Sequence, residues 1–201
     1  MRLLIATNNP AKRAEMETML AGLPVEVTSL GDFPEAPEVK EDGETLEENA
    51  AKKASEVARA CGIHAVADDS GLFVDALGGQ PGVRSARYAG PHPTSEKLCR
   101  KLLDEMRDIP DERRQAHFRC CIAMADPTGR VVVTASGRAD GIIIRAMQGE
   151  RGFGYDPVFL YEPAAKTFAE MVPDEKNAVS HRGQALKAFR RQFSRLLATQ
   201  Q

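Results

Sequence analysis

The chain has 201 residues, of which 42% are hydrophobic and 28% are charged, and its formal net charge is −2. This composition is typical of a soluble globular protein with one core or two closely joined lobes. The near-neutral charge and the absence of Trp argue against nucleic-acid binding through a basic field or a base-stacking platform. No apolar run approaches the length of a membrane span, so we expect no membrane partner.

The four cysteines are Cys61, Cys99, Cys120 and Cys121, and no two of them form a C-x-x-C pair. We interpret them as reduced thiols that serve as small apolar residues. The first apolar run is only four residues long, which is too short for a secretory signal peptide. We therefore expect a cytoplasmic protein.

Strands and helices alternate along the first half of the chain. Short runs with a strand-like pattern, bounded by turn residues, predict its strands. These runs cover residues 3–6, 25–30 and 63–67. After the first strand, Pro10 begins a helix that Asn9 caps.

An acidic loop and a second helix separate the second and third strands. The loop covers residues 31–43. Thr45 and Glu48 then form a capping box for a helix that Gly62 ends. A third helix is predicted over residues 94–107.

The second half of the chain contains a hairpin. The strands predicted there are residues 116–125, 130–136, 141–145 and 158–161. The first of them alternates between apolar and polar residues, and DPTG at residues 126–129 is a strong turn signal. Ser180 caps a final helix that runs to Leu197. Alternating elements followed by a hairpin predict an α/β fold, a mixed sheet flanked by helices.

The segment TNNPAK places Lys12 and Arg13 in the first turn of a helix. Backbone N–H groups at a helix N-terminus attract anions, and a cation there is unfavourable by roughly 0.3–1 kcal/mol unless an anion is bound. A phosphate site explains this pattern. The alternative is an ordinary capped helix with solvated basic residues, and this segment alone slightly favours that alternative.

Asp68 and Asp69 follow the third predicted strand and precede Ser70 and Gly71. In α/β sheets, ligands bind at the carboxyl ends of strands. We expect the Ser-Gly pair to turn the chain so that both carboxylates face one site. Such a pair suits Mg²⁺, which takes one or two carboxylates with phosphate oxygens and water, and one acid can act as general base. The alternative is an Asx turn that closes the strand.

The acidic loop carries more carboxylates than a helix cap needs. One or two of them, with Glu38 and Glu41 as candidates, would complete a metal site. Lys52 or Lys53, in the helix that follows, would neutralise phosphate if it points at that site. The alternative for most of these charges is a solvated face, and periodicity alone does not choose between the two.

Two later segments suit an aromatic ligand. In RGFGYDP, glycines flank Phe153, which together with Tyr155 can stack on a base, while Asp156 can accept base N–H protons. A turn with two core aromatics explains this segment equally well. In EKNAVSHRG, His181 and Arg182 stand in the first turn of a helix, where an electron-rich ligand would offset their unfavourable position.

Together these motifs resemble those of the inosine triphosphate pyrophosphatase family. They are ATNNPAK (6–12), ENAAKKA (48–54), ADDSGLFVDALGGQPGVRSARYAG (67–90), GFGYDPVF (152–159) and SHRGQAL (180–186). They occur in the family's order and spacing over nearly the whole chain. The resemblance implies a single domain over residues 1–201, with an elongated mixed sheet and a substrate cleft between two lobes. It also implies a homodimer and a Mg²⁺-dependent hydrolase that converts ITP, dITP and XTP to the monophosphate and pyrophosphate.

The resemblance implies roles for individual residues as well. Asp69 would be the general base and a metal ligand, with Asp68 as its catalytic partner and Glu41 and Glu38 as further metal ligands. The implied triphosphate ligands are Thr7, Asn8, Asn9, Lys12 and Lys53. The implied base pocket consists of Phe153, Gly154, Tyr155, Asp156, Lys176, His181 and Arg182, and Ser70 would also touch the substrate. The first loop departs from the family pattern at Pro10, which has no backbone N–H to donate.

Three other functions compete with this one. A Maf-like nucleotide pyrophosphatase has different motifs, and SHRGQAL argues against it. A non-catalytic nucleotide sensor would gain nothing from paired carboxylates and an acidic loop beside phosphate. An RNA-binding module is disfavoured by the neutral charge and the small number of aromatic residues.

Overall fold

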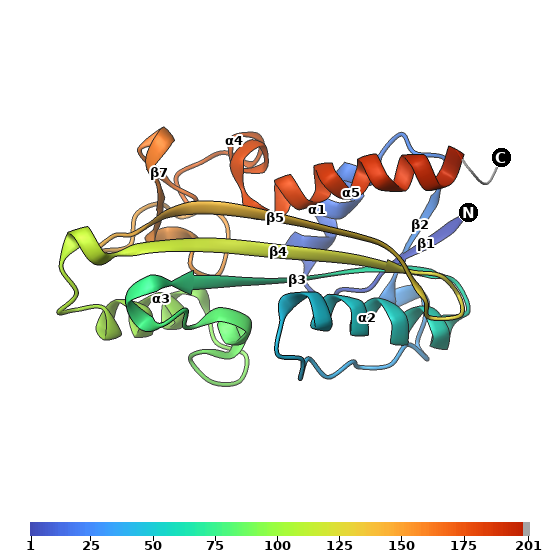
Figure 1. The fold of residues 1–201 in the computed structure, drawn as a ribbon, viewed down its shortest axis with the longest axis horizontal. Helices are drawn as coiled ribbons and strands as arrows, with labels where there is room; N and C mark the ends of the chain where they lie inside the picture. The colour runs from blue at the N-terminus through green and yellow to red at the C-terminus, as the bar shows by residue number, and fades with distance from the viewer. Residues whose placement is uncertain (199–201) are drawn as a thin grey trace. The chain divides into compact units, whose positions relative to one another are not determined.

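The computed structural model describes residues 1–198 and contains a seven-stranded mixed sheet with helices (Figure 1). The strand order is β2-β1-β3-β4-β5-β6-β7. β1 pairs in parallel with β2 and β3, whereas β6 pairs antiparallel with β5 and β7. The predicted α/β class with a mixed sheet is confirmed. Within residues 1–198, no helix is both long and apolar enough to cross a bilayer.

The elements follow the chain in the order that the sequence patterns predict, with a few additions. The strands are β1 (Arg2–Ile5), β2 (Glu26–Ser29), β3 (His64–Val74), β4 (Gln115–Ala125), β5 (Val131–Ile143), β6 (Phe159–Tyr161) and β7 (Lys166–Thr167). The α-helices are α1 (Pro10–Leu20), α2 (Leu46–Cys61), α3 (Ser95–Glu105), α4 (Pro173–Val179) and α5 (His181–Ala198). A 3₁₀ segment, η3, spans Gly82–Arg87. The short elements β7 and α4 were not predicted.

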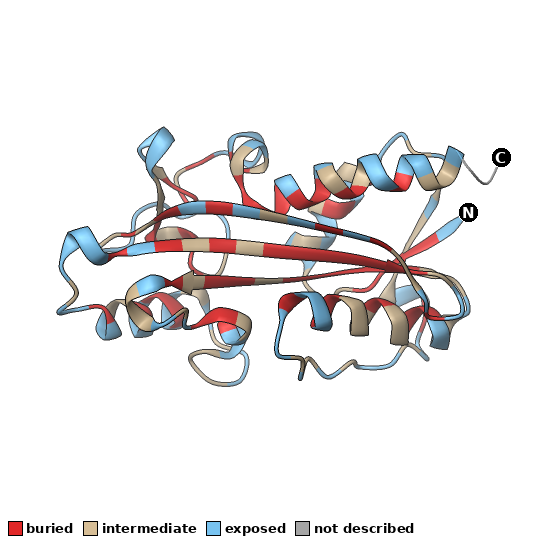
Figure 2. Ribbon diagram, viewed as in Figure 1, coloured by how far each residue is buried: buried red, intermediate tan, exposed pale blue. Residues whose placement is uncertain are grey.

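The chain divides into two compact units, each built from separate stretches of sequence. Unit 1 comprises residues 1–69, residues 120–137 and α5 from Gln184 onward, and unit 2 comprises residues 70–119 and 138–183. β3, β4 and β5 contribute residues to both units. Each unit has its own hydrophobic core, and buried residues run along β3 and β4 (Figure 2).

In unit 1, α1 and α5 cover one face of the sheet. Met16 and Leu20 of α1 pack with Leu186, Phe189 and Phe193 of α5 against inward-facing residues of β1, β3 and β4. Full burial of such side chains contributes roughly 1.5–3 kcal/mol each. The buried apolar residues of α1 and α5 therefore form part of the core of this unit.

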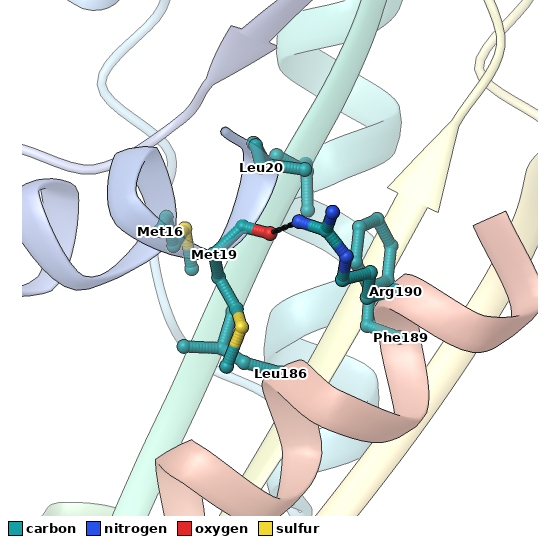
Figure 3. A pocket seen from close by; sticks show the side chains of 7 residues that line it. Met16, Met19, Leu20, Leu186, Phe189 and Arg190 are labelled. Atoms are coloured by element: carbon teal, nitrogen blue, oxygen red, sulfur yellow. Dashed lines mark hydrogen bonds between the residues drawn. The ribbon is translucent and has the colours of Figure 1, made fainter. Parts of the chain in front are cut away.

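Arg190 links the C-terminal end of α1 to α5. Its guanidinium Nη1 donates to the Met19 carbonyl oxygen (Figure 3). The same nitrogen donates to the Ala21 carbonyl oxygen at 2.9 Å. Carbonyls in the last turn of a helix have no intrahelical donor, so this contact serves as a cap. A small apolar cavity lies beside it, lined by Met16, Met19, Leu20, Val66, Leu186, Phe189 and the stem of Arg190.

The helix starts predicted from capping residues are confirmed. Asn9 Oδ1 accepts the N–H groups of Ala11 and Lys12 at 3.0 and 3.2 Å. At α2, Thr45 Oγ1 accepts the N–H of Glu48 at 3.1 Å, and the Glu48 carboxylate accepts the N–H of Thr45 at 3.3 Å. These caps fix where α1 and α2 begin, and so they place Lys12 and the side chains of α2.

The turn predicted at Ser70 and Gly71 is wrong. β3 runs unbroken from His64 to Val74, although the sequence pattern placed its end at residue 67. Gly71 lies within the strand because the backbone of Gly82 approaches it closely, and a Cβ on Gly71 would stand 2.4 Å from the Gly82 carbonyl oxygen. This glycine therefore permits a close contact between two segments.

The strand predictions in the second half of the chain need two corrections. β5 is one strand where two had been predicted, and Gly141 lies inside it because a Cβ there would stand 2.4 Å from the Leu160 carbonyl oxygen of β6. β4 does not alternate throughout, since residues 120–125 are buried on both faces. The predicted turn between these strands is confirmed by a hydrogen bond from the N–H of Gly129 to the Asp126 carbonyl at 2.8 Å.

Candidate functional site

The polar turn after β1 begins the first candidate site, in unit 1. Thr7 Oγ1 accepts the N–H of Asn9 at 3.2 Å, and Asn8 is exposed at the turn. Lys12, in the first turn of α1, places its Nζ 3.0 Å from Asp68 Oδ2. Its side chain is only 16% exposed. Lys12 is thus held against a buried carboxylate and is not the solvated lysine of an ordinary capped helix.

Asp69 is held from α2 by a residue that the sequence patterns did not single out. Asn49 Nδ2 donates to Asp69 Oδ2 at 3.0 Å, and Asn49 Oδ1 accepts the N–H of Gly43 at 2.8 Å. Asn49 is fully buried. Its signal in the sequence was an amide on the apolar stripe of α2, one helical turn before Lys53. Asn49 therefore ties the carboxylate of Asp69 to the acidic loop.

Lys53 connects Asp68 and Glu41 in this site. Its Nζ donates to the Asp68 carbonyl oxygen at 2.6 Å and to Glu41 Oε1 at 2.5 Å. Glu41 thus reaches the site from the acidic loop through an ion pair with Lys53. Glu38, by contrast, is exposed on that loop and joins neither candidate site.

Asp68 and Asp69 point to opposite faces of the sheet. Asp68 contacts Lys12 and lies 4.0 Å from Cys120 Sγ, on the face that α1 and α5 cover. Asp69 contacts Asn49 of α2, which covers the other face. Successive residues of an unbroken strand alternate between faces, so the expectation that a turn directs both acids the same way is wrong.

Both acids nevertheless lie where the neighbouring strand has ended. The last residue of β1, Ile5, pairs with Val66, and the N–H of Ala6 donates to the Val66 carbonyl at 2.8 Å. Beyond that point, the Asp68 carbonyl accepts a hydrogen bond from Lys53 Nζ. The carboxyl end of β1 thus opens the sheet edge, and Lys12 and Lys53 approach it from α1 and α2.

Burial and charge act together on this cluster. Burial raises the pKa of Asp69 above its ordinary value, Glu41 adds to the rise, and Lys53 and Lys12 oppose it. Burial alone would lower the pKa of Lys53, but Asp69, Asp68 and Glu41 together raise it. Three carboxylates and two ammonium groups share the site, which leaves an excess of negative charge.

The second candidate site lies in unit 2 around the half-buried Phe153. Lys176 Nζ lies 5.1 Å and Arg182 Cζ 5.3 Å from the centroid of its ring. Arg182 Nη2 also donates to Ser70 Oγ at 3.2 Å. Both cations are buried, and desolvated cation–π contacts contribute about 2 kcal/mol or more. These contacts bring two positive charges to one aromatic ring.

Asp156 organises the loop that carries Phe153. Its Oδ2 accepts from Lys176 Nζ at 2.5 Å and from the N–H of Phe153 at 2.8 Å. Burial raises the pKa of Asp156, whereas Lys176 and these hydrogen bonds oppose the rise. Gly152 has a φ of 76°, and a Cβ there would stand 2.0 Å from the same oxygen, so the loop requires glycine at this position.

Tyr155 and His181 are packed into the core of unit 2. Tyr155 is 3% exposed, and its hydroxyl donates to the Ser85 carbonyl at 2.9 Å. The ring of His181 stacks on Phe118 with centroids 4.6 Å apart and an interplanar angle of 9°. This placement favours the alternative in which Tyr155 is a core aromatic.

The four cysteines form no disulfide, as expected.

The candidate residues fall into two groups, one in each unit. The group in unit 1 consists of Thr7, Asn8, Asn9, Lys12, Glu41, Lys53, Asp68 and Asp69. The group in unit 2 consists of Ser70, Phe153, Gly154, Tyr155, Asp156, Lys176, His181 and Arg182. Each group combines buried charges with groups that suit one part of a nucleotide, phosphate in unit 1 and base in unit 2.

Comparison with known proteins shows which family the chain belongs to. A dITP/XTP pyrophosphatase of Geobacter sulfurreducens is 51% identical over 185 residues, which cover 92% of each chain. One from Desulforamulus reducens is 46% identical over the whole of both chains. The solved structure of a HAM1 protein from Coxiella burnetii has a TM-score of 0.88 at 38% identity and covers 99% of both chains. A sequence model described as the Ham1 family matches residues 3–192, and the chain belongs to this family.

Proposed function

We propose that the protein hydrolyses dITP, ITP and XTP to the nucleoside monophosphate and pyrophosphate. The buried cluster of Asp69, Asn49, Lys53, Lys12 and Asp68 carries this proposal, because it combines a positioned carboxylate with two phosphate-binding cations. The names of the relatives support the substrate class.

The triphosphate binds at the unit 1 site. Lys12 stands at the N-terminus of α1, where backbone N–H groups and the helix dipole favour an anion. Lys53 lies at the same sheet edge, and phosphate oxygens compete with the carboxylates of Asp68 and Glu41 for the two ammonium groups. The two ammonium groups are therefore in position before the triphosphate binds, which reduces the side-chain entropy lost on binding.

Mg²⁺ is the cofactor that the donor set suits. The excess of negative charge in the cluster grows when a triphosphate arrives, and a divalent cation offsets it. No group of three or more His, Cys, Asp or Glu side chains in residues 1–198 is arranged to hold a metal. The protein would supply one or two carboxylates, Asp69 with Glu41, and the phosphates would supply the remaining ligands. When bound, the ion would stabilise charge on the phosphoryl oxygens.

Asp69 acts as the general base. Burial raises the pKa of this carboxyl group towards neutral pH. A general base works best when its pKa lies near the pH of the reaction. Asn49 fixes Oδ2 and so orients the carboxylate. Asp68, on the opposite face of the sheet, positions Lys12 to bind the triphosphate.

The base binds at the unit 2 site. Phe153 offers an aromatic surface, and Arg182 and Lys176 beside it supply hydrogen-bond donors for a purine 6-oxo group. An adenine amine would leave these donors unpaired, and such a mismatch lowers kcat/KM by orders of magnitude. The homodimer and the single domain with a cleft between lobes stay predictions from the motifs, and the cytoplasmic location stays a prediction from the short first apolar run.

Pyrophosphate release from ITP, dITP, XTP, ATP and GTP, with and without Mg²⁺, tests the proposal. We expect rapid release from the first three only, and only with the metal. Equal turnover of ATP and ITP would contradict the assigned specificity. Tight binding of dITP with no turnover would favour the non-catalytic nucleotide sensor.

A further inference from the structure

The loop at residues 151–157 is held by contacts with its own residues and with α3. The N–H of Phe153 is bound by Asp156, and the hydroxyl of Tyr155 is bound by the Ser85 carbonyl. Gly154, between them, has a φ of 64°. This left-handed conformation gives the loop its sharp bend, and glycine adopts it without steric cost. The conformation of the backbone at Gly154 therefore determines the orientation of the neighbouring Phe153.

Both backbone polar groups of Gly154 are bound by one helix. Ser95 Oγ, at the first residue of α3, accepts the N–H of Gly154 at 2.8 Å. Cys99 Sγ, one turn further along, donates to the Gly154 carbonyl at 3.3 Å. Residues four apart on a helix lie on the same face, so the two side chains can bind the N–H and the carbonyl of the same glycine.

The thiol of Cys99 is suited to this role. The side chain is fully buried in the core of unit 2, and burial raises the pKa of Cys99 to about 12. The sulfur consequently stays protonated and keeps its donor hydrogen at neutral pH. The contact explains the position of this cysteine by a hydrogen bond in addition to packing.

We propose that Ser95 and Cys99 are positioning residues for the purine base, because they fix Gly154 and thereby the orientation in which Phe153 meets the base. This inference rests on the proposed function, in which Phe153 contacts the base. Both residues belong to unit 2, whereas the phosphate cluster belongs to unit 1, so we expect their effect to be confined to recognition of the base. Their loss weakens nucleotide binding and leaves phosphate binding unchanged.

Four single variants and one double variant separate this role from general damage to the fold. Ser95→Ala removes the acceptor, Cys99→Ala removes the donor, and Cys99→Ser keeps a donor at the same position. Glu96→Ala changes the exposed neighbour of Ser95 on α3 and serves as the matched control. The double variant Ser95→Ala/Cys99→Ala removes both contacts.

The measurements are steady-state kinetics with dITP, and calorimetric binding of dIMP and of inorganic triphosphate. Each hydrogen bond contributes a few-fold, so we expect either Ala variant to raise the KM for dITP about 3- to 10-fold with kcat nearly unchanged. The dIMP dissociation constant should rise by the same factor, whereas that of inorganic triphosphate stays within about 2-fold of the wild-type value. Cys99→Ser and Glu96→Ala should match the wild type.

Two outcomes would overturn the inference. One is a double variant that binds dIMP as tightly as the wild type does. The other is a parallel loss of dIMP and inorganic triphosphate binding, which would indicate a purely structural role. Wild-type protein that binds dIMP but hydrolyses no dITP would instead contradict the proposed function and leave the positioning role intact.

Discussion

Asn49 uses both ends of its side-chain amide, donating to Asp69 Oδ2 at 3.0 Å and accepting from the N–H of Gly43 at 2.8 Å. The amide connects the proposed general base to the loop that carries Glu41. A buried amide whose oxygen and nitrogen are both hydrogen-bonded has one favoured orientation. Its hydrogen bond to Asp69 therefore fixes the position of that carboxylate. No local sequence pattern required an asparagine at this point of α2.

Replacing Asn49 tests this connection. Asn49→Ala removes the hydrogen bonds to Asp69 and Gly43, and Asn49→Asp keeps the shape but exchanges the donor for a second carboxylate. We expect kcat for dITP to fall about 10- to 100-fold in both, as for other residues that orient a catalytic ligand, with a smaller change in KM. Glu56→Gln on the same helix is the control. Unchanged kcat in Asn49→Ala would refute the orienting role.

The two adjacent aspartates should differ in their kinetic effects, because they contact different partners. Asp69→Asn removes the proposed base, and we expect kcat to fall about 10²- to 10⁴-fold. Asp68→Asn weakens the hold on Lys12, so it should mainly raise the KM for dITP. Steady-state kinetics of the two variants measures the difference. Full activity of Asp69→Asn, or equal effects of the two changes on kcat, would contradict this division of roles.

Gly71→Ala should destabilise the protein through a steric clash with the backbone of Gly82. The new Cβ would stand 2.4 Å from the Gly82 carbonyl oxygen, and overpacking of this kind costs roughly 1–3 kcal/mol. Urea titration measures the free energy of unfolding. Gly31→Ala is the matched control, since a Cβ there would meet only Ser29 Oγ, at 3.6 Å. Equal stabilities of the two variants would show that β3 and Gly82 separate easily.

His117 should make stability depend on pH. It stacks on Phe73 in unit 2, and burial lowers its pKa below the ordinary value of about 6.5. Arg138 and Arg119 lower this pKa further, whereas Asp75 and Asp140 oppose them. The folded state thus prefers neutral imidazole. As the pH falls below about 6.5, the unfolded state takes up the proton first, and stability is lost until the pH passes the folded-state pKa.

The variant His117→Gln removes this contribution. We expect the wild-type Tm to fall more than that of His117→Gln between about pH 7.5 and pH 5.5, as measured by differential scanning calorimetry. His64 has a pKa that burial also lowers, but it is present in both proteins and cancels in the comparison. A larger fall in the variant would mean that the sign of the linkage is wrong.

The sequence by itself determined the features that depend on neighbouring residues. These features rest on hydrogen bonds between residues at most four positions apart. They are the caps at Asn9 and Thr45, the turn at residues 126–129 and the Ser180 cap at the start of α5. Helical and strand periodicity then indicated the α/β class, and the motifs indicated the family.

Only the tertiary structure decided how those pieces meet. β3 continues past Asp69 because its partners and the Gly82 backbone, eleven residues beyond Gly71, sustain it, and this continuation sends the two aspartates to opposite faces. The roles of Asn49 and Tyr155 likewise depend on groups 20 and 70 residues away along the chain. Local propensity carries no record of such distant contacts, which is why the turn predicted at Ser70 and Gly71 was wrong where the caps were right.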